Sequence, residues 1–490
     1  MKTHAFLMLC CIFASGSMSV QKATYPRITL IFEAPPENGH FRIGETGPYT
    51  SPRYDLTYYA DDYQRRKIEL NHEQASDTVV IDADRNEVEI EHNYRALGKI
   101  PFFFQAGDTV LFRYEGQLPF AEVKNRDVPD VELNYAVAVR KRLWGGDFSA
   151  AEKAEGLIFF IDKNRPQFSI KEHAPIQARE YNEKEMIGLE AESHFLDSLY
   201  ATQSISEQAY RHYKDQMELR RIDLSLQLSE SYSPPDSLFT RYETSRLFTS
   251  AFRKMLFRFF YQEITLRVPT IAPQAGFKYP DYRAQYDSLL AAEAIQGLAR
   301  EILLYETLEN IIQHFPVEDA FVYIKKHKEA SEGHLDAEVL VEKYRLAGGI
   351  SAQMTVQDPS GSEWDFEALL AQHKGKVVYI DFWASWCRPC IAAFPAAQVL
   401  KETYRESDIV FLYLSLDDSE ESWQKATQQY GLLSHSYRVA NKHTSQLLES
   451  LEVKSIPRYL LFDKTGALVH RNAPGPGGEI SRLLEGYLGE

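Results

Sequence analysis

The sequence predicts a multidomain protein with a β-rich N-terminal domain, an α-helical middle region and a C-terminal α/β domain. The chain has 490 residues, so it is longer than a single domain usually is. Short alternating apolar patterns give way near residue 175 to apolar residues at three- and four-residue steps, which are typical of helices. After residue 348, strand-like runs and helical patterns alternate, as they do in α/β domains.

An export signal is predicted over residues 1–20. A positively charged start precedes an apolar run at residues 5–14, and small residues follow it. This run is too short to span a bilayer comfortably. Cys10 and Cys11 lie inside the run and are not preceded by a small residue, so a lipoprotein-type cleavage is not expected. We therefore expect a periplasmic protein, soluble or peripherally associated with the membrane.

The chain is acidic. Its 54 Lys and Arg residues and 70 Asp and Glu residues give a formal net charge of −16. This charge argues against nucleic acid or an anionic membrane surface as a partner, because both are themselves negative. Most of the acidic residues are interpreted as a solvated surface that keeps the protein in solution.

Residues 24–175 are predicted to form the β-rich domain. Strands are expected at 27–32, 87–91 and 109–114, where β-branched, aromatic and alternating residues are bounded by Gly, Pro and Asn. Such short strands suggest an antiparallel sandwich or a single sheet. No spacing of catalytic residues is found in this part of the chain.

Residues 176–347 are predicted to be helical. Helical spacing of apolar residues runs through 185–228, 237–264 and 282–314, and prolines separate these segments. The aromatic cluster at 257–261 is most simply explained as packing between helices. A ligand groove is the alternative for this cluster.

Residues 348–490 are predicted to form the α/β domain. Residues 348–349 and 358–361, rich in Gly and Pro, are interpreted as a linker that precedes it. The alternating elements are expected at these positions: strand 376–383, helix 388–404, strand 409–415, helix 420–430, strand 458–463 and helix 478–488.

The Cys-Arg-Pro-Cys sequence at residues 387–390 lies between the first strand and the first helix of this domain. Once the signal is removed, it contains the remaining two of the four cysteines. A single pair three residues apart is typical of a redox site rather than of a disulfide scaffold. No metal or other cofactor is expected, since no second Cys or His pair has ligand spacing. His435, His443 and His470 are expected at the surface or in loops.

Residues 378–390, Val-Tyr-Ile-Asp-Phe-Trp-Ala-Ser-Trp-Cys-Arg-Pro-Cys, resemble the active-site segment of thioredoxins. The surroundings are more similar to the TlpA-like thiol-disulfide oxidoreductases, which are exported proteins of the thioredoxin fold. The features in common are Lys-Gly-Lys at 374–376, a long stretch before the proline loop, and Ile456-Pro457 followed by Arg-Tyr-Leu-Leu-Phe-Asp-Lys-Thr-Gly. The resemblance covers the thioredoxin-like domain alone, about 140 residues, which is an ordinary domain length.

The resemblance implies a role for each residue of the site. Cys387, at the helix start, is the attacking thiol, because the helix dipole and backbone N–H groups stabilise its thiolate. Cys390 resolves the mixed disulfide. Pro457 matches the proline that is cis in this family, and a cis bond there exposes the backbone of Ile456 for strand-like pairing with a polypeptide.

Four further residues are interpreted from their position in this segment. Asp381 is expected to be buried beneath the thiols and to take the proton of the resolving cysteine, directly or through water; a purely structural role is the alternative. Trp386 is expected to flank and shield the attacking thiol, whereas Trp383 is assigned to the core. Arg388 either lowers the pKa of the attacking thiol or extends into water with little effect.

These interpretations predict an exported protein-disulfide reductase whose partners are disulfide-containing exported polypeptides. A membrane thiol electron donor is implied by the family. One alternative is a thiol oxidase, since the direction of exchange depends on the reduction potential. The other is a binding or assembly protein, in which the thioredoxin-like domain serves as a redox-sensitive docking module for the large upstream region.

Overall fold

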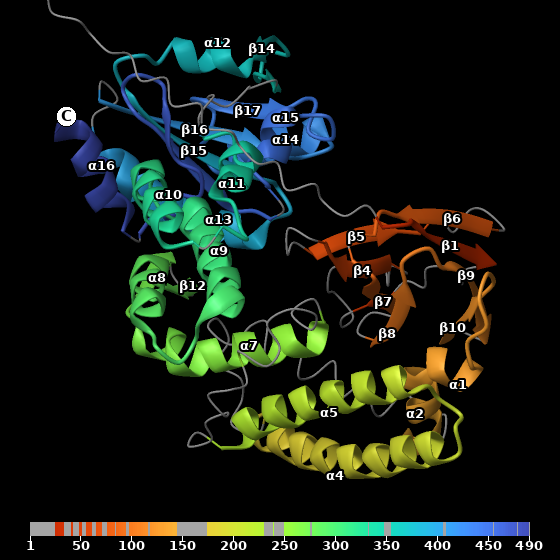
Figure 1. Ribbon diagram of the computed structural model, residues 1–490. Coiled ribbons are helices and arrows are strands. Elements are labelled where there is room, and N and C mark those ends of the chain that lie inside the picture. Colours follow the sequence, from red (N-terminus) through yellow and green to blue (C-terminus); the bar gives the residue numbers. More distant parts are fainter. Residues whose placement is uncertain are drawn as a thin grey trace, which may run out of the picture. The chain divides into compact units, whose positions relative to one another are not determined.

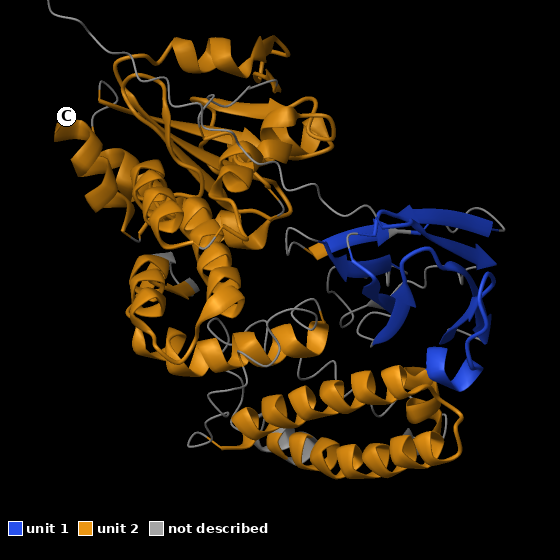
Figure 2. Ribbon diagram, viewed as in Figure 1, with its two compact units in different colours: residues 1–61, 66–134 blue, residues 62–65, 135–490 orange. Residues whose placement is uncertain are grey.

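The chain forms two compact units in the computed structural model (Figure 2), one made of residues 1–61 and 66–134, the other of residues 62–65 and 135–490. The domain boundaries expected from the sequence stay predictions. The export signal expected at residues 1–20 lies outside the described residues. The structure describes residues 25–33, 41–42, 49–50, 55–60, 65–70, 76–83, 85–94, 98–115, 118–144, 174–229, 239, 249–274, 277–331, 333–346, 354–404, 408–453, 455–477 and 479–489.

The first unit contains two four-stranded sheets, with strand orders β10-β9-β1-β6 and β5-β4-β7-β8 (Figure 1). Alternate side chains of these strands point inward, and Phe112 of the first sheet contacts Phe102 of the second edge to face, with ring centroids 5.2 Å apart. The predicted β-rich region is confirmed, but the first sheet is not wholly antiparallel as expected, because β1 pairs with β9 in parallel. Its strands are β1 (Ile28–Glu33), β2 (Phe41–Arg42), β3 (Tyr49–Thr50), β4 (Asp55–Tyr59), β5 (Arg65–Glu69), β6 (Ser76–Ile81), β7 (Glu87–Tyr94), β8 (Gly98–Gln105), β9 (Thr109–Glu115) and β10 (Leu118–Val123).

Two helices lie inside the segment that the sequence assigns to strands: α1 (Asp130–Leu133) and α2 (Tyr135–Trp144). The buried residues Tyr135, Val137 and Val139 alternate along α2, a pattern that suits a strand equally well. Contacts with distant helices decide the outcome, because the Tyr135 ring stacks on Tyr213 with centroids 4.0 Å apart.

The middle region is helical, as predicted, and local caps divide it. The side chains of Ser206, Thr249 and Asp281 each accept a hydrogen bond from a backbone amide at the start of a helix. A hairpin that the sequence reading missed follows α7. The elements are α4 (Ala174–Ala201), α5 (Glu207–Leu228), α7 (Ser250–Glu263), the 3₁₀ turn Thr265–Arg267, β11 (Thr270–Gln274), β12 (Phe277–Pro280), α8 (Tyr282–Ala291), α9 (Gly297–His314), α10 (Val317–Ala330) and α11 (Ala337–Lys343).

Helices α7 to α11 share one hydrophobic core. Leu308 of α9 belongs to it and is fully buried, and Phe259 and Phe260 of α7 are buried in the same core. This confirms the interpretation of the aromatic cluster as helix packing. Among the described residues, no helix combines the length and the apolarity that crossing a membrane requires.

The C-terminal part is a seven-stranded mixed sheet in the order β14-β13-β17-β16-β15-β18-β19. Strands β15, β16 and β17 are parallel, and the outer strands are antiparallel to their neighbours. The predicted α/β domain is thereby confirmed. Its elements are β13 (Thr355–Gln357), β14 (Glu363–Asp365), α12 (Phe366–Ala371), β15 (Val377–Trp383), α13 (Arg388–Thr403), β16 (Ile409–Ser415), α14 (Glu420–Gln429), β17 (Ser436–Val439), α15 (Gln446–Ser450), β18 (Arg458–Phe462), β19 (Leu468–His470) and α16 (Ile480–Gly489).

The two faces of this sheet have separate cores. Helices α13, α14 and α16 contribute to the core that contains Val377, Tyr379 and Trp383. Helices α12 and α15 contribute to the core on the opposite side of β15, with Ile380 and Phe382. Covering both faces explains why the central strands read as continuous apolar runs.

The sequence suggests a linker at residues 348–349 and 358–361. Residues 348–349 lie outside the described residues, and residues 358–361 form the turn between β13 and β14 instead. The Gly361 amide donates to the Asp358 carbonyl at 2.9 Å, and Gly361 has a φ of +88°, which glycine adopts readily. Gly and Pro therefore mark a tight turn inside the domain here, because the short strands on either side pair with each other.

We expect Leu308→Ala to lower the free energy of unfolding by about 3 kcal/mol, since truncating a buried leucine loses its contacts and leaves a cavity. Val322→Ala, on the exposed side of α10, is the matched control and should change it by less than about 0.5 kcal/mol. Denaturant titrations followed by circular dichroism compare the two variants. Equal effects would contradict the position of the core.

Candidate active site

The Cys-Arg-Pro-Cys segment lies where β15 passes into α13. Every residue of β15 is buried, and α13 begins at Arg388 with Cys387 as its N-cap residue. Pro389 occupies the first helical turn, where its missing N–H costs no intrahelical hydrogen bond. An apolar strand followed at once by a proline-containing helix start therefore places both cysteines at the N-terminus of α13.

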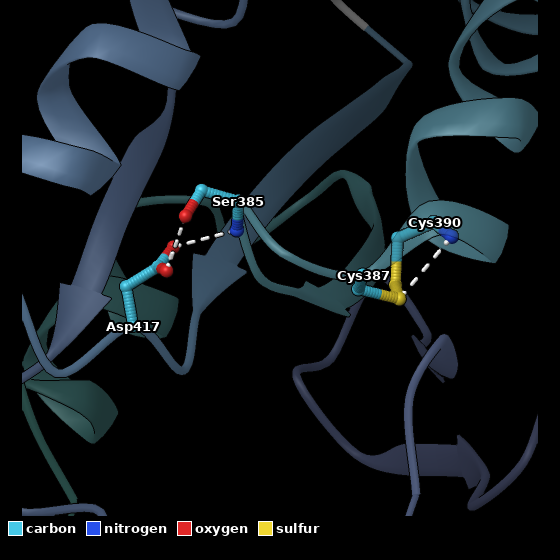
Figure 3. Close-up of a disulfide and its surroundings, with 4 residues drawn as sticks. All are labelled: Ser385, Cys387, Cys390 and Asp417. Carbon is cyan, nitrogen blue, oxygen red and sulfur yellow. Dashed lines mark hydrogen bonds between the residues drawn. A yellow bond between two sulfur atoms is a disulfide. The ribbon is translucent and has the colours of Figure 1, made fainter. Parts of the chain in front are cut away.

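Cys387 and Cys390 are joined by a disulfide (Figure 3), with their Cα atoms 5.3 Å apart. The Sγ atom of Cys387 also accepts a hydrogen bond from the Cys390 amide at 3.2 Å, so this sulfur caps the helix. A helix N-terminus favours negative charge on an atom in this position. The structure thus brings together the two residues that the sequence predicts as the redox pair.

Both cysteines are almost entirely buried, whereas the tryptophan that precedes them is exposed. Cys387 is 3% exposed and Cys390 is 0% exposed, whereas the side chain of Trp386 is 66% exposed. Trp383 is fully buried, which confirms its assignment to the core. Trp386 directly precedes Cys387 in the chain, so the residue next to this buried cysteine is exposed to solvent.

Asp381 lies on the face of β15 that is covered by α13. Its neighbours at two-residue spacing, Tyr379 and Trp383, belong to the same core as both cysteines. The carboxyl group is buried, and neither of its oxygen atoms has a hydrogen-bond partner among the described residues. Burial raises the pKa of Asp381 to about 8. At neutral pH the group is therefore mostly protonated and close to the midpoint of its titration.

Two tyrosines flank Asp381 across the sheet. Tyr413 of β16 and Tyr459 of β18 are its partners in the strand register, and both belong to the core that contains the cysteines. Burial, and secondarily the charge of Asp381, raises the pKa of both hydroxyl groups. Asp381 thus lies between the neutral phenol groups of Tyr413 and Tyr459. The sequence does not indicate this arrangement, because it does not show the register between strands.

The turn before the cysteines is held by Asp417, a second feature that the sequence reading missed (Figure 3). The Ser385 amide and hydroxyl donate to the two carboxylate oxygens of Asp417 at 2.8 and 2.6 Å. The Ser415 hydroxyl also donates to Asp417, at 2.8 Å. Asp417 follows the carboxyl end of β16. The sequence could have indicated its role only through the rule that loops at the carboxyl ends of adjacent parallel strands lie close together.

The peptide bond between Ile456 and Pro457 is cis, as the resemblance implies. β18 begins directly after it and runs antiparallel to β15, with Arg458 opposite Phe382. The proline therefore lies at the end of the sheet where β15 passes into α13. The side chain of Ile456 packs against the core that contains both cysteines and also against the core on the opposite side of the sheet.

The histidines contribute nothing to this site. His443 is exposed and His435 is half-buried, whereas His470 is buried, which corrects the expectation of a surface or loop position. Burial lowers the pKa of His470 to about 3, so it is neutral at physiological pH. Within the described ranges, no three His, Cys, Asp or Glu side chains gather into a group that could hold a metal ion.

Comparisons with known proteins agree with this geometry. Residues 375–468 match the thioredoxin-like family model. Over 147 residues the chain is 29% identical to the thiol-disulfide oxidoreductase ResA of Bacillus cereus and to that of Bacillus anthracis, covering 30% of this chain and 79% of each relative. A crystal structure of a proposed thiol-disulfide oxidoreductase from Bacteroides vulgatus is 32% identical and covers 29% of this chain and 99% of that one, with a TM-score of 0.25.

The C-terminal part of the chain is therefore a thioredoxin-like domain. This domain makes up about 30% of the chain and is similar to the thiol-disulfide oxidoreductases of the TlpA/ResA type. The matched segment contains Asp381, Cys387, Cys390 and Pro457. The comparisons above concern this domain alone.

The raised pKa of Asp381 predicts a pH-dependent stability. The folded-state pKa of about 8 lies above the ordinary aspartate pKa of about 4, so the folded protein binds the extra proton. The stabilisation is complete below about pH 4 and is lost as pH rises to about 8, by up to about 5 kcal/mol. We expect Asp381→Asn to abolish this dependence in the oxidised protein.

Unfolding at pH 5 and pH 8, followed by tryptophan fluorescence, measures the effect, since four of the five tryptophans lie in residues 364–423. Glu421→Gln, which removes an exposed carboxylate from α14, serves as the control and should keep the wild-type dependence. Parallel behaviour of wild type and Asp381→Asn would show that the carboxyl group titrates normally.

Proposed function

We propose that this protein is an exported thiol-disulfide oxidoreductase that reduces disulfides in other exported polypeptides. The observation that carries the proposal is the Cys387–Cys390 disulfide at the N-terminus of α13. The face of β15 that α13 covers bears the buried carboxyl group of Asp381, which has a pKa of about 8. A sulfur that is stabilised as a thiolate and a nearby proton acceptor are the two groups that disulfide exchange needs.

The exchange proceeds in two balanced steps. The Cys387 thiolate attacks one sulfur of the substrate disulfide, which forms a mixed disulfide and releases the other substrate sulfur as a thiolate that takes a proton. Cys390 then loses its proton and attacks the Cys387 sulfur. This forms the Cys387–Cys390 disulfide and releases the second substrate thiol, so that two electrons pass from the protein to the substrate.

The remaining site residues assist these steps. The deprotonated fraction of Asp381, which is the minor fraction at neutral pH because its pKa is about 8, takes the proton of Cys390 as that thiol attacks, directly or through water. Backbone groups of Ile456, next to the cis bond, pair with the substrate chain as an added strand would. The exposed indole of Trp386 covers the mixed disulfide on its solvent side.

Export and the electron donor belong to the same proposal. The apolar run near the start of the chain supports export. A membrane thiol donor, which the family implies, returns the disulfide to the dithiol after each cycle. Disulfide-containing exported polypeptides are the proposed substrates, and the net charge of −16 supports a partner other than nucleic acid.

We expect the full-length Cys390→Ala variant to retain a mixed disulfide between Cys387 and its substrate, because the resolving thiol is missing. Non-reducing electrophoresis followed by mass spectrometry identifies the trapped chains. Cys387→Ala is the control and should trap none. Turnover of insulin should fall by at least about a hundredfold in both variants, as expected when a nucleophile or its resolving partner is removed. Trapping through Cys390 in the Cys387→Ala variant would reverse the assigned roles.

The direction of exchange is decided by the reduction potential of the Cys387–Cys390 pair. We expect a value near that of reducing thioredoxins, about −270 mV, rather than that of strong oxidants, about −120 mV. Equilibration with glutathione or dithiothreitol buffers, read by thiol alkylation, measures it. A value close to −120 mV would replace the reductase assignment by the oxidase.

A further inference from the structure

One arginine connects three distant segments of the second unit. Arg471 follows β19 and is buried. Its Nη1 donates to the backbone carbonyl of Tyr344, directly after α11, at 2.7 Å, and its Nη2 donates to the carbonyl of Ser450, the last residue of α15, at 2.6 Å. Its guanidinium carbon lies 5.2 Å from the centroid of the Tyr344 ring. The helical region and the thioredoxin-like domain therefore meet at this side chain.

A second arginine extends the connection to the cis-proline. Arg458 follows Pro457 directly, and its Nη2 donates to the carbonyl of Leu451 at 3.0 Å while its Nε donates to the carbonyl of Arg471 at 3.1 Å. Ser450 and Leu451 form the C-terminal end of α15, where carbonyl groups lack intrahelical partners and attract cations. Two guanidinium groups thus hold this helix end and the start of β18 together.

Glu452 is held in an uncommon conformation at the same place. Its φ is +49°, in the left-handed region that residues other than glycine adopt rarely. Its carboxylate lies 3.4 Å from the Tyr344 hydroxyl and 3.7 Å from the Lys343 ammonium group. Such a conformation persists where the surrounding groups stabilise it. Two of the groups around Glu452, the Tyr344 hydroxyl and the Lys343 ammonium group, come from the helical region.

The buried charges of Arg458 and Arg471 make the contact between the helical region and the thioredoxin-like domain sensitive to the loss of a partner on either side. Burial, and secondarily the nearby Arg471, lowers the pKa of Arg458 to about 10. Burial likewise lowers the pKa of Arg471 to about 10, and Tyr344 and Glu452 oppose that shift. Both guanidinium groups remain charged at neutral pH, and removing a partner of a buried charge costs far more than removing an exposed one.

A backbone contact lies beside the arginines. Pro316, the N-cap residue of α10, forms an antiparallel bridge with His470 at the end of β19. His470 directly precedes Arg471, so the bridge fixes the backbone from which the arginine extends. The helical region is therefore attached to the sheet by backbone and by side chains.

We propose that Arg471 and Tyr344 are positioning residues for disulfide exchange. They hold Ser450, Glu452 and Arg458 in place, and through Arg458 they orient the Ile456–Pro457 surface that receives the substrate backbone. The helices upstream of the thioredoxin-like domain thereby determine how well a polypeptide disulfide binds, while the sulfur chemistry stays in Cys387 and Cys390. This inference rests on the proposed function.

The test compares a polypeptide substrate with a small one. In the full-length protein, Arg471→Gln should raise the KM for insulin about fivefold, because a smaller fraction of molecules presents a binding-competent surface. Its kcat should be unchanged, as should the rate of reduction of the small disulfide 5,5′-dithiobis(2-nitrobenzoate) and the Cys387–Cys390 potential. A change in KM alone distinguishes positioning from a general loss of structure.

Two further variants complete the experiment. Arg438→Gln removes an arginine that donates to the Gln357 side chain at 2.8 and 3.3 Å, between β17 and β13, and should leave all four quantities unchanged. Tyr344→Phe keeps the ring and the carbonyl but removes the hydroxyl, which donates to Glu309 at 2.7 Å and lies 3.4 Å from the Glu452 carboxylate. This variant should raise the insulin KM in the same direction. Tyr344→Phe decides the question if Arg471→Gln does not fold.

The outcomes separate the two proposals. A wild-type protein that reduces neither substrate overturns the proposed function itself. A wild-type protein that reduces both, with an unchanged insulin KM in Arg471→Gln and Tyr344→Phe, overturns the positioning role alone. An equal loss of activity toward insulin and the small disulfide also overturns it, because positioning of a polypeptide cannot affect a substrate that needs only the sulfur.

Discussion

The burial of β15 on both faces is the constraint on which the site depends. Its backbone is paired on both edges, by β16 and by β18, and helices cover both of its faces. A strand so enclosed cannot shift its register without moving its apolar side chains out of both cores. This one strand determines three features of the site. It places Asp381 on the side covered by α13, it fixes the end of the sheet at which Pro457 lies, and it sets the point at which Cys387 caps α13.

The parts of this structure that could be predicted from the sequence are those with a local cause. The run from Val377 to Trp383 is continuously apolar except for one acid, and a β-branched and aromatic run of that length is typical of a buried strand. The spacing of Cys387 and Cys390 is likewise local, since one helical turn brings them within bonding distance. The three regions of the fold were predictable for the same reason.

The parts that could not be predicted depend on contacts between distant residues. Asp417 reaches Ser385 across 32 positions, and Arg471 reaches Tyr344 across 127. Neither residue differs in the sequence from an ordinary surface residue. The turn at 358–361 was interpreted as a linker because the strands beside it have three residues each, too few to show a period. His470 was expected near the surface because its burial arises from packing that no local pattern records.

The sulfur of Cys387 takes part in a hydrogen bond and in a covalent bond. It is the cap of α13, through the Cys390 amide, and it is also the atom that changes its covalent bonding during exchange. A negatively charged sulfur accepts that hydrogen bond more strongly than a sulfur bonded to another sulfur does. The first turn of α13 is consequently held more tightly when Cys387 is a thiolate than when its sulfur is bonded to another sulfur, so the strength of this helix cap follows the oxidation state of the site.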